Sequence, residues 1–586
     1  MLTRWGRDLD PENPLPEYPR PQLLRDSSTW RNLNGTWLYA FAGAERPATW
    51  DGTIVVPFSP EAPLSGVGRQ LQPEEYLWYR REGLTFPAAP AGGRALLHFG
   101  AVDQSCAVWV NGTEVGSHTG GYLPFTLDVT DALSPGSQCV EVRVRDLSET
   151  GPHARGKQRL DRGRIWYTAQ SGIWQTVWVE VVPERYVAEL TILPDPETCT
   201  FQVVVEEAAR SDLSSRTPAT VRLLDTGTLV AETTGPSGTP LQIDVPDPHL
   251  WDLDDPFLYD LEISLGDDRV TSYAALRSFG IGTDTEGRRR FLLNGRPVQH
   301  TGVLDQGYWP DGLLTPPSDA AMVHDITTMK SLGFTMLRKH VKIEPLRWYH
   351  HCDRIGMLVW QDMVNGGGRY RHLVTDLPAR RPVRLSDHRY GLFFRQDEAA
   401  REEFRAEVRR TVELLRNVAS IAVWVPFNEG WGQFDANEIA AEVKALDPTR
   451  SVNHVSGWID QGGGDVKSYH SYLGRFRFRP RRRERRVQAL TEYGGYSLKV
   501  DGHDWSQLEF GYRHYETSAA LGEGFAALHR DQIEPAVRRG LAATVYTQLS
   551  DVEDELNGLL TWDREVLKIP PETIRDALAA LAASQG

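Results

Sequence analysis

The chain has 586 residues, 40% of them hydrophobic, and a formal net charge of -15 at pH 7. That length predicts about three to five domains of ordinary globular composition, and the acidic balance argues against nucleic acid as a partner. No apolar run reaches the roughly 20 residues that a membrane-spanning helix needs, and residues 1–21 lack the apolar core of a signal peptide, so we expect a cytoplasmic protein without a membrane partner.

Strand signals dominate residues 1–183, which are predicted to form a first antiparallel β-sandwich. Turn residues punctuate this stretch, and the Asn111-Gly112 dipeptide between two apolar runs is a strong hairpin signal. The clearest strand candidates are Ala95–Phe99, Ala107–Val110, Cys139–Val144 and Val177–Val182.

A second all-β segment spans residues 184–281. Its strand candidates, Phe201–Val205, Thr220–Leu224 and Leu258–Ile263, are separated by Gly, Pro, Ser and Asp. A stretch of about 100 residues with this pattern has the size of an immunoglobulin-like sandwich. No Cys-Trp-Cys spacing indicates an antibody-type domain, so the strand pattern alone supports this prediction.

Strand and helix patterns alternate over residues 282–586. The expected strands are Val298–Val303, Thr335–Arg338, Met357–Gln361, Ile421–Phe427, Val452–Val455, Val466–His470, Val487–Thr491 and Leu541–Leu549. Helices are expected at Ala320–Leu332, Pro345–Ile355, Ala399–Arg416 and Ala436–Ala445. Eight strands with intervening helices over about 300 residues predict a (β/α)8 TIM barrel.

Two arginine-rich segments lie between the predicted elements. Residues 369–384 belong to a long connection after the third barrel strand, on the side where active-site loops usually lie. Residues 475–486 have no aromatic residues in their densest basic part, so we interpret them as a solvated loop rather than a nucleic-acid patch. The role of both segments is left open.

Two of the predicted barrel strands end in a glutamate. Ile421–Phe427 leads into Asn428-Glu429, and Val487–Thr491 leads into Glu492, which places Glu429 on the fourth strand and Glu492 on the seventh. Catalytic residues of barrels sit at the carboxyl ends of strands. Two such carboxylates suit glycoside hydrolysis, in which one acts as acid and then base and, in retaining enzymes, the other is the nucleophile.

These residues make the sequence resemble glycoside hydrolase family 2, which includes β-galactosidases, β-glucuronidases and β-mannosidases. Asn428-Glu429 matches the acid/base motif of that family, and Thr491–Gly494 matches its nucleophile motif. Motifs of its sugar-binding sandwich and of the start of its barrel are matched by Trp78–Arg81, Leu97–Asp103, Val108–Gly112, Gly120–Phe125, Ser171–Gln175, Phe279-Gly280 and Phe291–Gly295. The resemblance implies two antiparallel β-sandwiches, a jelly-roll sugar-binding-like one (1–183) and an immunoglobulin-like one (184–281), followed by a catalytic TIM barrel (282–586).

The resemblance also implies roles for the matching residues. Glu429 would be the acid/base, Glu492 the nucleophile, and Asn428 a hydrogen-bond partner of the substrate 2-hydroxyl.

Five further residues at strand ends resemble supporting residues of the family. Arg338 and His340 end the second strand, although the family usually has its His one residue further along. Asp362 ends the third strand, where the family often has an acidic residue. Tyr469 and His470 end the sixth strand and would face the sugar or the nucleophile.

Another four residues are predicted substrate contacts because they bring polar groups and aromatic rings to the barrel mouth. Sugar hydroxyls need hydrogen bonds, and the C–H face of a sugar needs a flat apolar partner. Asp305 and Trp309 follow the first strand, Trp431 follows the fourth, and Gln548 follows the eighth.

The identity of the substrate sugar is inferred from the absence of one lysine. In β-glucuronidases of this family an Asn-x-Lys motif near the last strand binds the carboxylate, and the corresponding stretch here, Glu555-Leu556-Asn557 before Gly558, has no Lys. We therefore expect a retaining, exo-acting β-glycosidase of β-galactosidase-like specificity that acts on terminal non-reducing sugars. The alternatives are a β-glucuronidase, with a cation from the 369–384 loop, or β-mannoside, arabinoside or galactofuranoside specificity. The partner is a small oligosaccharide or glycoside, and a homo-oligomer is left open.

Two rival functions come from other classes. A non-catalytic carbohydrate-binding protein would not need both glutamates. A metal-dependent hydrolase needs a ligand cluster, but there is no HxH or HExxH pattern, the four cysteines form no Cys-x-x-Cys pair, and His350-His351 point to different sides of a predicted helix. We therefore expect no required cofactor and no metal site. Some family members bind Mg²⁺ or Na⁺ near the active site, but no residue here indicates such a site.

Overall fold

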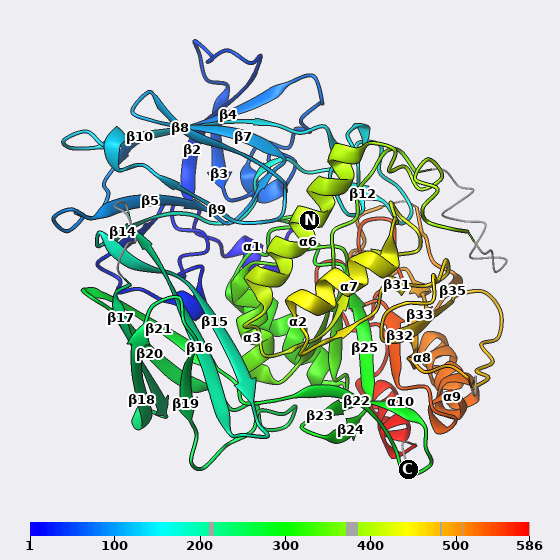
Figure 1. Ribbon diagram of the computed structural model, residues 1–586. Coiled ribbons are helices and arrows are strands. Elements are labelled where there is room, and N and C mark those ends of the chain that lie inside the picture. The colour runs from blue at the N-terminus through cyan, green and yellow to red at the C-terminus, as the bar shows by residue number, and fades with distance from the viewer. Residues whose placement is uncertain (210–215, 371–384, 481–482, 507, 585–586) are drawn as a thin grey trace.

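The structure, a computed structural model, describes residues 1–209, 216–370, 385–480, 483–506 and 508–584. It confirms the predicted fold class of two antiparallel sandwiches followed by a parallel barrel. In Figure 1 the first sandwich is blue to cyan, the second is teal to green, and the barrel runs from green to red. No helix within the described ranges is long and apolar enough to cross a membrane.

The first sandwich consists of a six-stranded and a four-stranded antiparallel sheet. Their strand orders are β3-β2-β4-β10-β7-β8 and β1-β14-β5-β9. The Asn111-Gly112 turn joins β7 to β8 with both residues at positive φ, as a tight hairpin requires. The strands are β1 (Trp30–Asn32), β2 (Gly35–Ala42), β3 (Gly52–Val56), β4 (Tyr76–Leu84), β5 (Arg94–Phe99), β7 (Ser105–Val110), β8 (Thr113–Thr119), β9 (Phe125–Asp128), β10 (Gln138–Arg145) and β14 (Val177–Val182).

The second sandwich packs a three-stranded sheet, ordered β15-β16-β19, against a four-stranded sheet, ordered β18-β17-β20-β21. Alternate residues of the strands face the shared core, as in Val203 and Val205 or Leu261 and Ile263. The strands are β15 (Arg185–Asp195), β16 (Thr200–Ala209), β17 (Pro218–Asp225), β18 (Thr228–Pro236), β19 (Leu241–Asp244), β20 (Tyr259–Leu265) and β21 (Asp268–Ala274).

Eight parallel strands form the barrel in the order β30-β28-β27-β26-β25-β36-β33-β32. Among the described residues, no ladder joins β30 to β32, so the barrel is nearly rather than fully closed. In chain order its strands are β25 (His300–Asp305), β26 (Met336–Lys339), β27 (Leu358–Asp362), β28 (Ile421–Val425), β30 (Ser451–Val452), β32 (Val466–Ser471), β33 (Val487–Gly494) and β36 (Ala543–Thr547).

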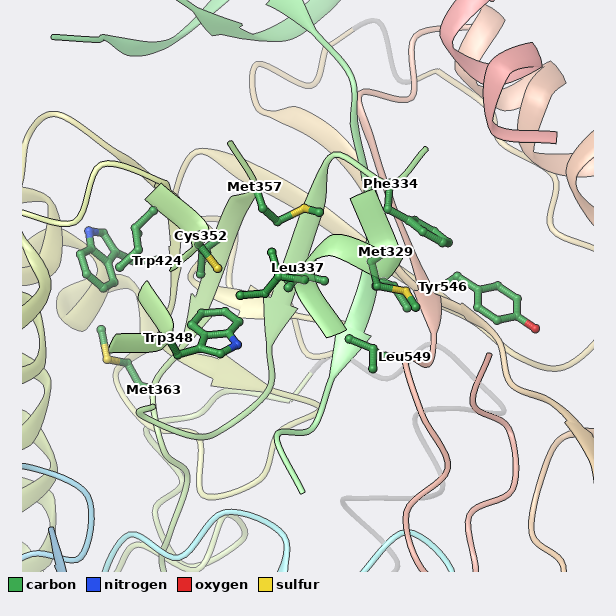
Figure 2. Close-up of a cluster of buried hydrophobic side chains, with 14 of the residues drawn as sticks. Met329, Phe334, Leu337, Trp348, Cys352, Met357, Met363, Trp424, Tyr546 and Leu549 are labelled. Carbon is green, nitrogen blue, oxygen red and sulfur yellow. The ribbon is translucent and has the colours of Figure 1, made fainter. Parts of the chain in front are cut away.

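Helices cover the outside of the barrel through apolar faces at helical spacing. Met322, Ile326 and Met329 on α2 are buried, as are Trp348 and Cys352 on α3. Figure 2 shows Met329, Trp348 and Cys352 packed beside Leu337 of β26. The helices that correspond to predicted ones are α2 (Asp319–Ser331), α3 (Leu346–Ile355), α6 (Glu398–Leu415) and α7 (Ala436–Leu446).

Among the predicted strands whose bounds differ from the structure, two differ for identifiable reasons. The expected strand Val298–Val303 begins only at His300, because Asn294-Gly295 forms a hairpin turn between β23 (Arg289–Leu293) and β24 (Arg296–Val298). The expected strand Ile421–Phe427 ends at Val425, because Pro426 has no N–H for the ladder. The chain resumes pairing in β29 (Phe427–Asn428), which leads directly to Glu429.

One segment of the first sandwich, residues 151–170, leaves its sheets and lies against the barrel mouth. We call it the mouth segment. It contains β11 (Gln158–Arg159) and β12 (Tyr167–Thr168), and β12 is labelled on the cyan ribbon in Figure 1. The backbone N–H groups of Arg155 and Gly156 donate to the carbonyl of Asn365, just beyond β27, at 2.9 and 3.0 Å. The barrel mouth is therefore built from two domains.

Candidate active site

Arg338 on β26 links the ends of three other strands, β27, β29 and β33. Its fully buried guanidinium donates from Nε and Nη2 to the two carboxylate oxygens of Asp362, at 3.0 and 2.9 Å. Nη2 also donates to Oδ1 of Asn428 at 2.9 Å, and Nη1 donates to Oε1 of Glu492 at 3.0 Å. The planar fork of an arginine suits such multidentate binding. Arg338 therefore fixes an amide and a carboxylate that the sequence predicts to be functional.

Glu429 and Glu492 both lie beside Nδ1 of His470. Nδ1 of His470 is 2.8 Å from Oε1 of Glu429 and 3.3 Å from Oε2 of Glu492. One oxygen of each carboxylate lies within 4.8 Å of the other. Retaining glycosidases hold their carboxyl groups about 5–5.5 Å apart, whereas inverting enzymes need about 6.5–9.5 Å to admit a water molecule. The close pair matches the retaining spacing.

The surroundings move the pKa values of the two glutamates in opposite directions. Burial, followed by the nearby charge of Glu492, raises the pKa of Glu429. Burial also acts to raise the pKa of Glu492, but His470, Arg338 and His340 outweigh it and the net pKa is lowered. A protonated carboxylic acid beside an ionised carboxylate is the arrangement needed by a general acid and a nucleophile.

Tyr472 completes the surroundings of Glu492 and was missed at the sequence level. Its hydroxyl donates to Oε2 of Glu492 at 2.6 Å and lies 2.8 Å from Oγ1 of Thr547. Its ring stacks on Tyr512 with centroids 4.0 Å apart. Side chains two residues apart on a strand share a face, so the position two residues after His470 was the available signal.

The neighbouring Tyr469 was predicted to face the sugar, but its contacts are elsewhere. Its hydroxyl donates to Oε1 of Gln488 at 3.0 Å, and its ring packs against Phe476 and Phe478. Tyr469 and His470 are adjacent on β32 and must point to opposite faces. Only His470 reaches the glutamates, so the prediction for Tyr469 is corrected.

His340 and Trp431 lie beside this centre as the sequence predicts. Nδ1 of His340 is 2.8 Å from Oδ2 of Asp362, and burial holds the pKa of His340 well below its usual value. The ring of Trp431 is 5.9 Å from that of His340 and 5.2 Å from Trp166 of the mouth segment. Trp431 is thus enclosed between the barrel and the first sandwich.

Two of the remaining three predicted contacts, Asp305 and Trp309, are placed differently. The Asp305 carboxylate binds Nζ of Lys339 at 2.6 Å inside the barrel wall. The Trp309 ring is covered by Arg564 and Trp5. Both side chains are thus occupied by protein groups rather than presented to a sugar. Trp309 is covered because the loop after the first strand packs against the N-terminal segment. Gln548 accepts a 2.6 Å bond from Gln306, and within the described residues its Nε2 has no partner.

The arginine-rich segments contribute little to this centre in the described structure. Residues 371–384 of the first lie outside the described residues. In the second, Arg486 pairs with Asp460 and Glu484, and Arg475 donates to the carbonyl of Asp531. These contacts are with the protein itself.

Two clusters in the described ranges have metal-like ligand spacing. One is the Glu429, His470 and Glu492 centre itself. The other is His388, Asp435 and Glu438, where Asp435 already binds the guanidinium of Arg405 at 3.0 Å. In the first cluster the ligand atoms already bond to one another, and in the second the Asp435 carboxylate already has a cationic partner.

Family models for three consecutive parts match the chain. "Glycosyl hydrolases family 2, sugar binding domain" matches residues 72–182, "Glycosyl hydrolases family 2" matches 184–281, and "Glycosyl hydrolases family 2, TIM barrel domain" matches 287–475. The chain belongs to glycosyl hydrolase family 2. These three matches confirm the family that the motifs around Glu429 and Glu492 suggested.

The relatives that this chain resembles include proteins named beta-glucuronidase and proteins named beta-galactosidase. A putative beta-glucuronidase of Formosa agariphila is 25% identical over 58% of this chain and 41% of its own length. Beta-glucuronidase of Felis catus is 25% identical over 75% of this chain and 70% of its own length. Beta-galactosidase of Klebsiella pneumoniae strain 342 is 27% identical over 64% of this chain and 35% of its own length. The chain thus spans about two fifths of the Formosa relative.

Solved structures support the same fold. The beta-D-glucuronidase of Dictyoglomus thermophilum superposes with a TM-score of 0.73 at 16% identity, over 96% of this chain and 98% of that one. At this identity the likeness shows the arrangement of domains and strands.

Proposed function

We propose that this family 2 chain is a retaining, exo-acting β-glycosidase that hydrolyses terminal β-linked uronic acids. The observation that supports the reaction is the pair of close carboxylates, Glu429 and Glu492, whose pKa values are moved apart. The names of the relatives favour the β-glucuronidase alternative over the β-galactosidase-like specificity expected from the sequence.

The geometry supports a two-step displacement. In the first step Glu429 gives its proton to the glycosidic oxygen while Glu492 attacks the anomeric carbon, so the C–O bond to the aglycone breaks and a glycosyl-enzyme ester forms. In the second step ionised Glu429 takes a proton from water. The resulting hydroxyl attacks the anomeric carbon and releases Glu492.

Asn428 is suited to bind the sugar 2-hydroxyl. Its Oδ1 accepts a hydrogen bond from Arg338, which fixes the orientation of the amide. Its Nδ2 is buried and has no partner among the described residues. A buried donor without a partner is costly, and a substrate hydroxyl would satisfy it in the complex.

A panel of 4-nitrophenyl β-glycosides tests the reaction, with the anomer of the released sugar followed by NMR. We expect turnover with retention of the β-anomer. Sugar binding without turnover of any substrate would favour the non-catalytic alternative, and an inverted product would contradict the displacement mechanism. Loss of turnover with a chelator would favour a metal-dependent hydrolase.

A further inference from the structure

We propose that Lys157, from the mouth segment, binds the carboxylate of a uronosyl substrate. This inference rests on the proposed function. It supplies the cation that the Asn557 region lacks. There, the sequence has Glu555 and Asn557 and no lysine, and Nδ2 of Asn557 donates to Oε1 of Glu555 at 3.0 Å.

Close backbone packing brings Lys157 to the catalytic centre. Gly156 has a φ of +62°, and a Cβ at this position would lie 2.9 Å from the carbonyl oxygen of Val341, the residue after His340. The chain can therefore approach the end of β26 only because residue 156 is a glycine. The Lys157 ammonium then lies 5.8 Å from the centre of the Trp431 ring.

The Lys157 ammonium is buried, and its nearest described counter-ion lies 3.9 Å away. Its nearest described partners are the Tyr167 hydroxyl at 3.5 Å and Oε2 of Glu555 at 3.9 Å. Both oxygens of Glu555 already accept hydrogen bonds, from Tyr167 and from Asn557. A buried ammonium has three donors and is costly unless it is paired.

The other buried lysines of the described chain each have two or three close partners. Lys339 donates to Asp305 and Glu344 at 2.6 and 2.7 Å. Lys342 donates to two carbonyls at 2.7 Å and pairs with Glu344. Lys568 donates to Asp551 at 2.6 Å and to two carbonyls. By this comparison, Lys157 is the buried lysine whose ammonium has no described partner closer than 3.5 Å.

The charge of Lys157 acts to lower the pKa values of His340 and Glu429. After burial, it is the next largest cause that lowers the pKa of His340. It also acts against burial and the Glu492 charge, which raise the pKa of Glu429. A sugar held at the two glutamates would therefore lie within the field of this ammonium.

The other described cations of the mouth segment are engaged elsewhere. Arg155 donates to the carbonyls of Gly367 and Gly368, and Arg162 pairs with Asp554. Arg159 and Arg164 lie over the rings of Trp166 and Phe510. Lys157 differs from Arg159 and Arg164 in being buried, so a charge-assisted bond from its ammonium to an anionic substituent would be shielded from water.

A cycle of two enzymes and two substrates isolates this interaction. kcat/KM is measured for the wild type and Lys157→Met on 4-nitrophenyl β-D-glucuronide and on the β-D-glucoside, which has CH₂OH in place of the carboxylate. The galacturonide and galactoside form a second pair. We expect kcat/KM to fall about 100-fold on the uronide and less than about 3-fold on the neutral glycoside, because only the former loses a charge-assisted bond.

Two further variants control the cycle. Lys157→Arg keeps the charge and should restore part of the uronide activity, which a packing defect would not allow. Arg164→Met removes an exposed cation of the same segment and should change both substrates equally. An equal fall of Lys157→Met on uronide and neutral glycoside would overturn the proposal.

A binding experiment separates this proposal from the proposed reaction. Calorimetry compares glucuronic acid with glucose on the wild type and on Lys157→Met. If no glycoside is turned over, the proposed reaction fails, but selective loss of glucuronic acid binding in Lys157→Met still supports the carboxylate site. Unchanged binding of glucuronic acid in that variant overturns it.

Discussion

The hydroxyl of Tyr472 donates a 2.6 Å hydrogen bond to Oε2 of Glu492. The other oxygen of this carboxylate accepts from Arg338, so each oxygen has its own donor from a different strand end. Hydrogen bonds to the ionised form of a carboxylate favour that form. The barrel thus holds Glu492 as an anion although burial acts in the opposite direction.

Tyr472→Phe should weaken the nucleophile and move its titration. The pKa of Glu492 is lowered in part by this hydrogen bond, so its loss should raise that pKa. Since Glu492 must be ionised, activity falls as pH drops through its pKa, and the acidic limb of the kcat/KM profile should move to higher pH. A lost bond to a charged group, about 1.5–3 kcal/mol, corresponds to a fall of roughly 10- to 150-fold. Tyr469→Phe is the matched control and should leave the acidic limb in place.

Replacement of each glutamate should give a distinct kinetic pattern. Glu492→Gln should remove nearly all turnover on every substrate because no glycosyl-enzyme can form, while substrate binding is largely kept. Glu429→Gln should be most damaging for poor leaving groups and least for nitrophenolates, which need little proton donation. Kinetics on a series of aryl glycosides of graded leaving-group pKa measure this. An unchanged rate in either variant would contradict the assignment.

His470→Asn should shift the whole pH profile toward alkaline values. His470 acts to lower the pKa of both glutamates, so its removal should raise both. Glu429 must be protonated in the first step, so activity is lost as pH rises through its pKa and that limb moves up. Glu492 must be ionised, so the acidic limb moves up as well. His388→Asn, an exposed histidine, is the control, and limbs that stay in place in His470→Asn would refute the bridging role.

Sequence reasoning located the glutamates because apolar strand runs end where polar residues begin. The predicted strand ends near Glu429 and Glu492 lie close to those of β28 and β33, and parallel strands bring such ends to one face. The same rule placed Asp305 at the mouth, but it could not reveal that Lys339 neutralises it within the wall. A residue's position relative to a strand end predicts that it lies near the barrel mouth. Whether its side chain faces the substrate depends on the side chains that it pairs with.

Contacts between segments far apart in the sequence could not be predicted from the sequence. Lys157 belongs to a sandwich loop, and its approach to Trp431 depends on how the first domain docks on the barrel. Trp166 reaches the same tryptophan in the same way. Tyr472, in contrast, directly follows β32 and comes two residues after His470, so strict use of the two-residue period would have selected it instead of Tyr469.

Arg338→Met should destabilise the barrel as well as inactivate it. The guanidinium is the cation that directly pairs with both Asp362 and Glu492, so its removal leaves two buried carboxylates uncompensated. Breaking a buried ion pair in this way costs about 3–5 kcal/mol.

Without Arg338 the folded-state pKa of both acids should rise. Carboxylates with a raised folded-state pKa destabilise the protein above their unfolded pKa, and protonation relieves this as pH falls. The deficit in thermal midpoint, measured by calorimetry, should therefore be larger at pH 7.5 than at pH 5. Arg530→Met, which removes an exposed arginine paired only with its neighbour Asp531 in the described contacts, should change the midpoint little at either pH. A pH-independent deficit in Arg338→Met would show that lost packing, rather than uncompensated charge, causes the instability.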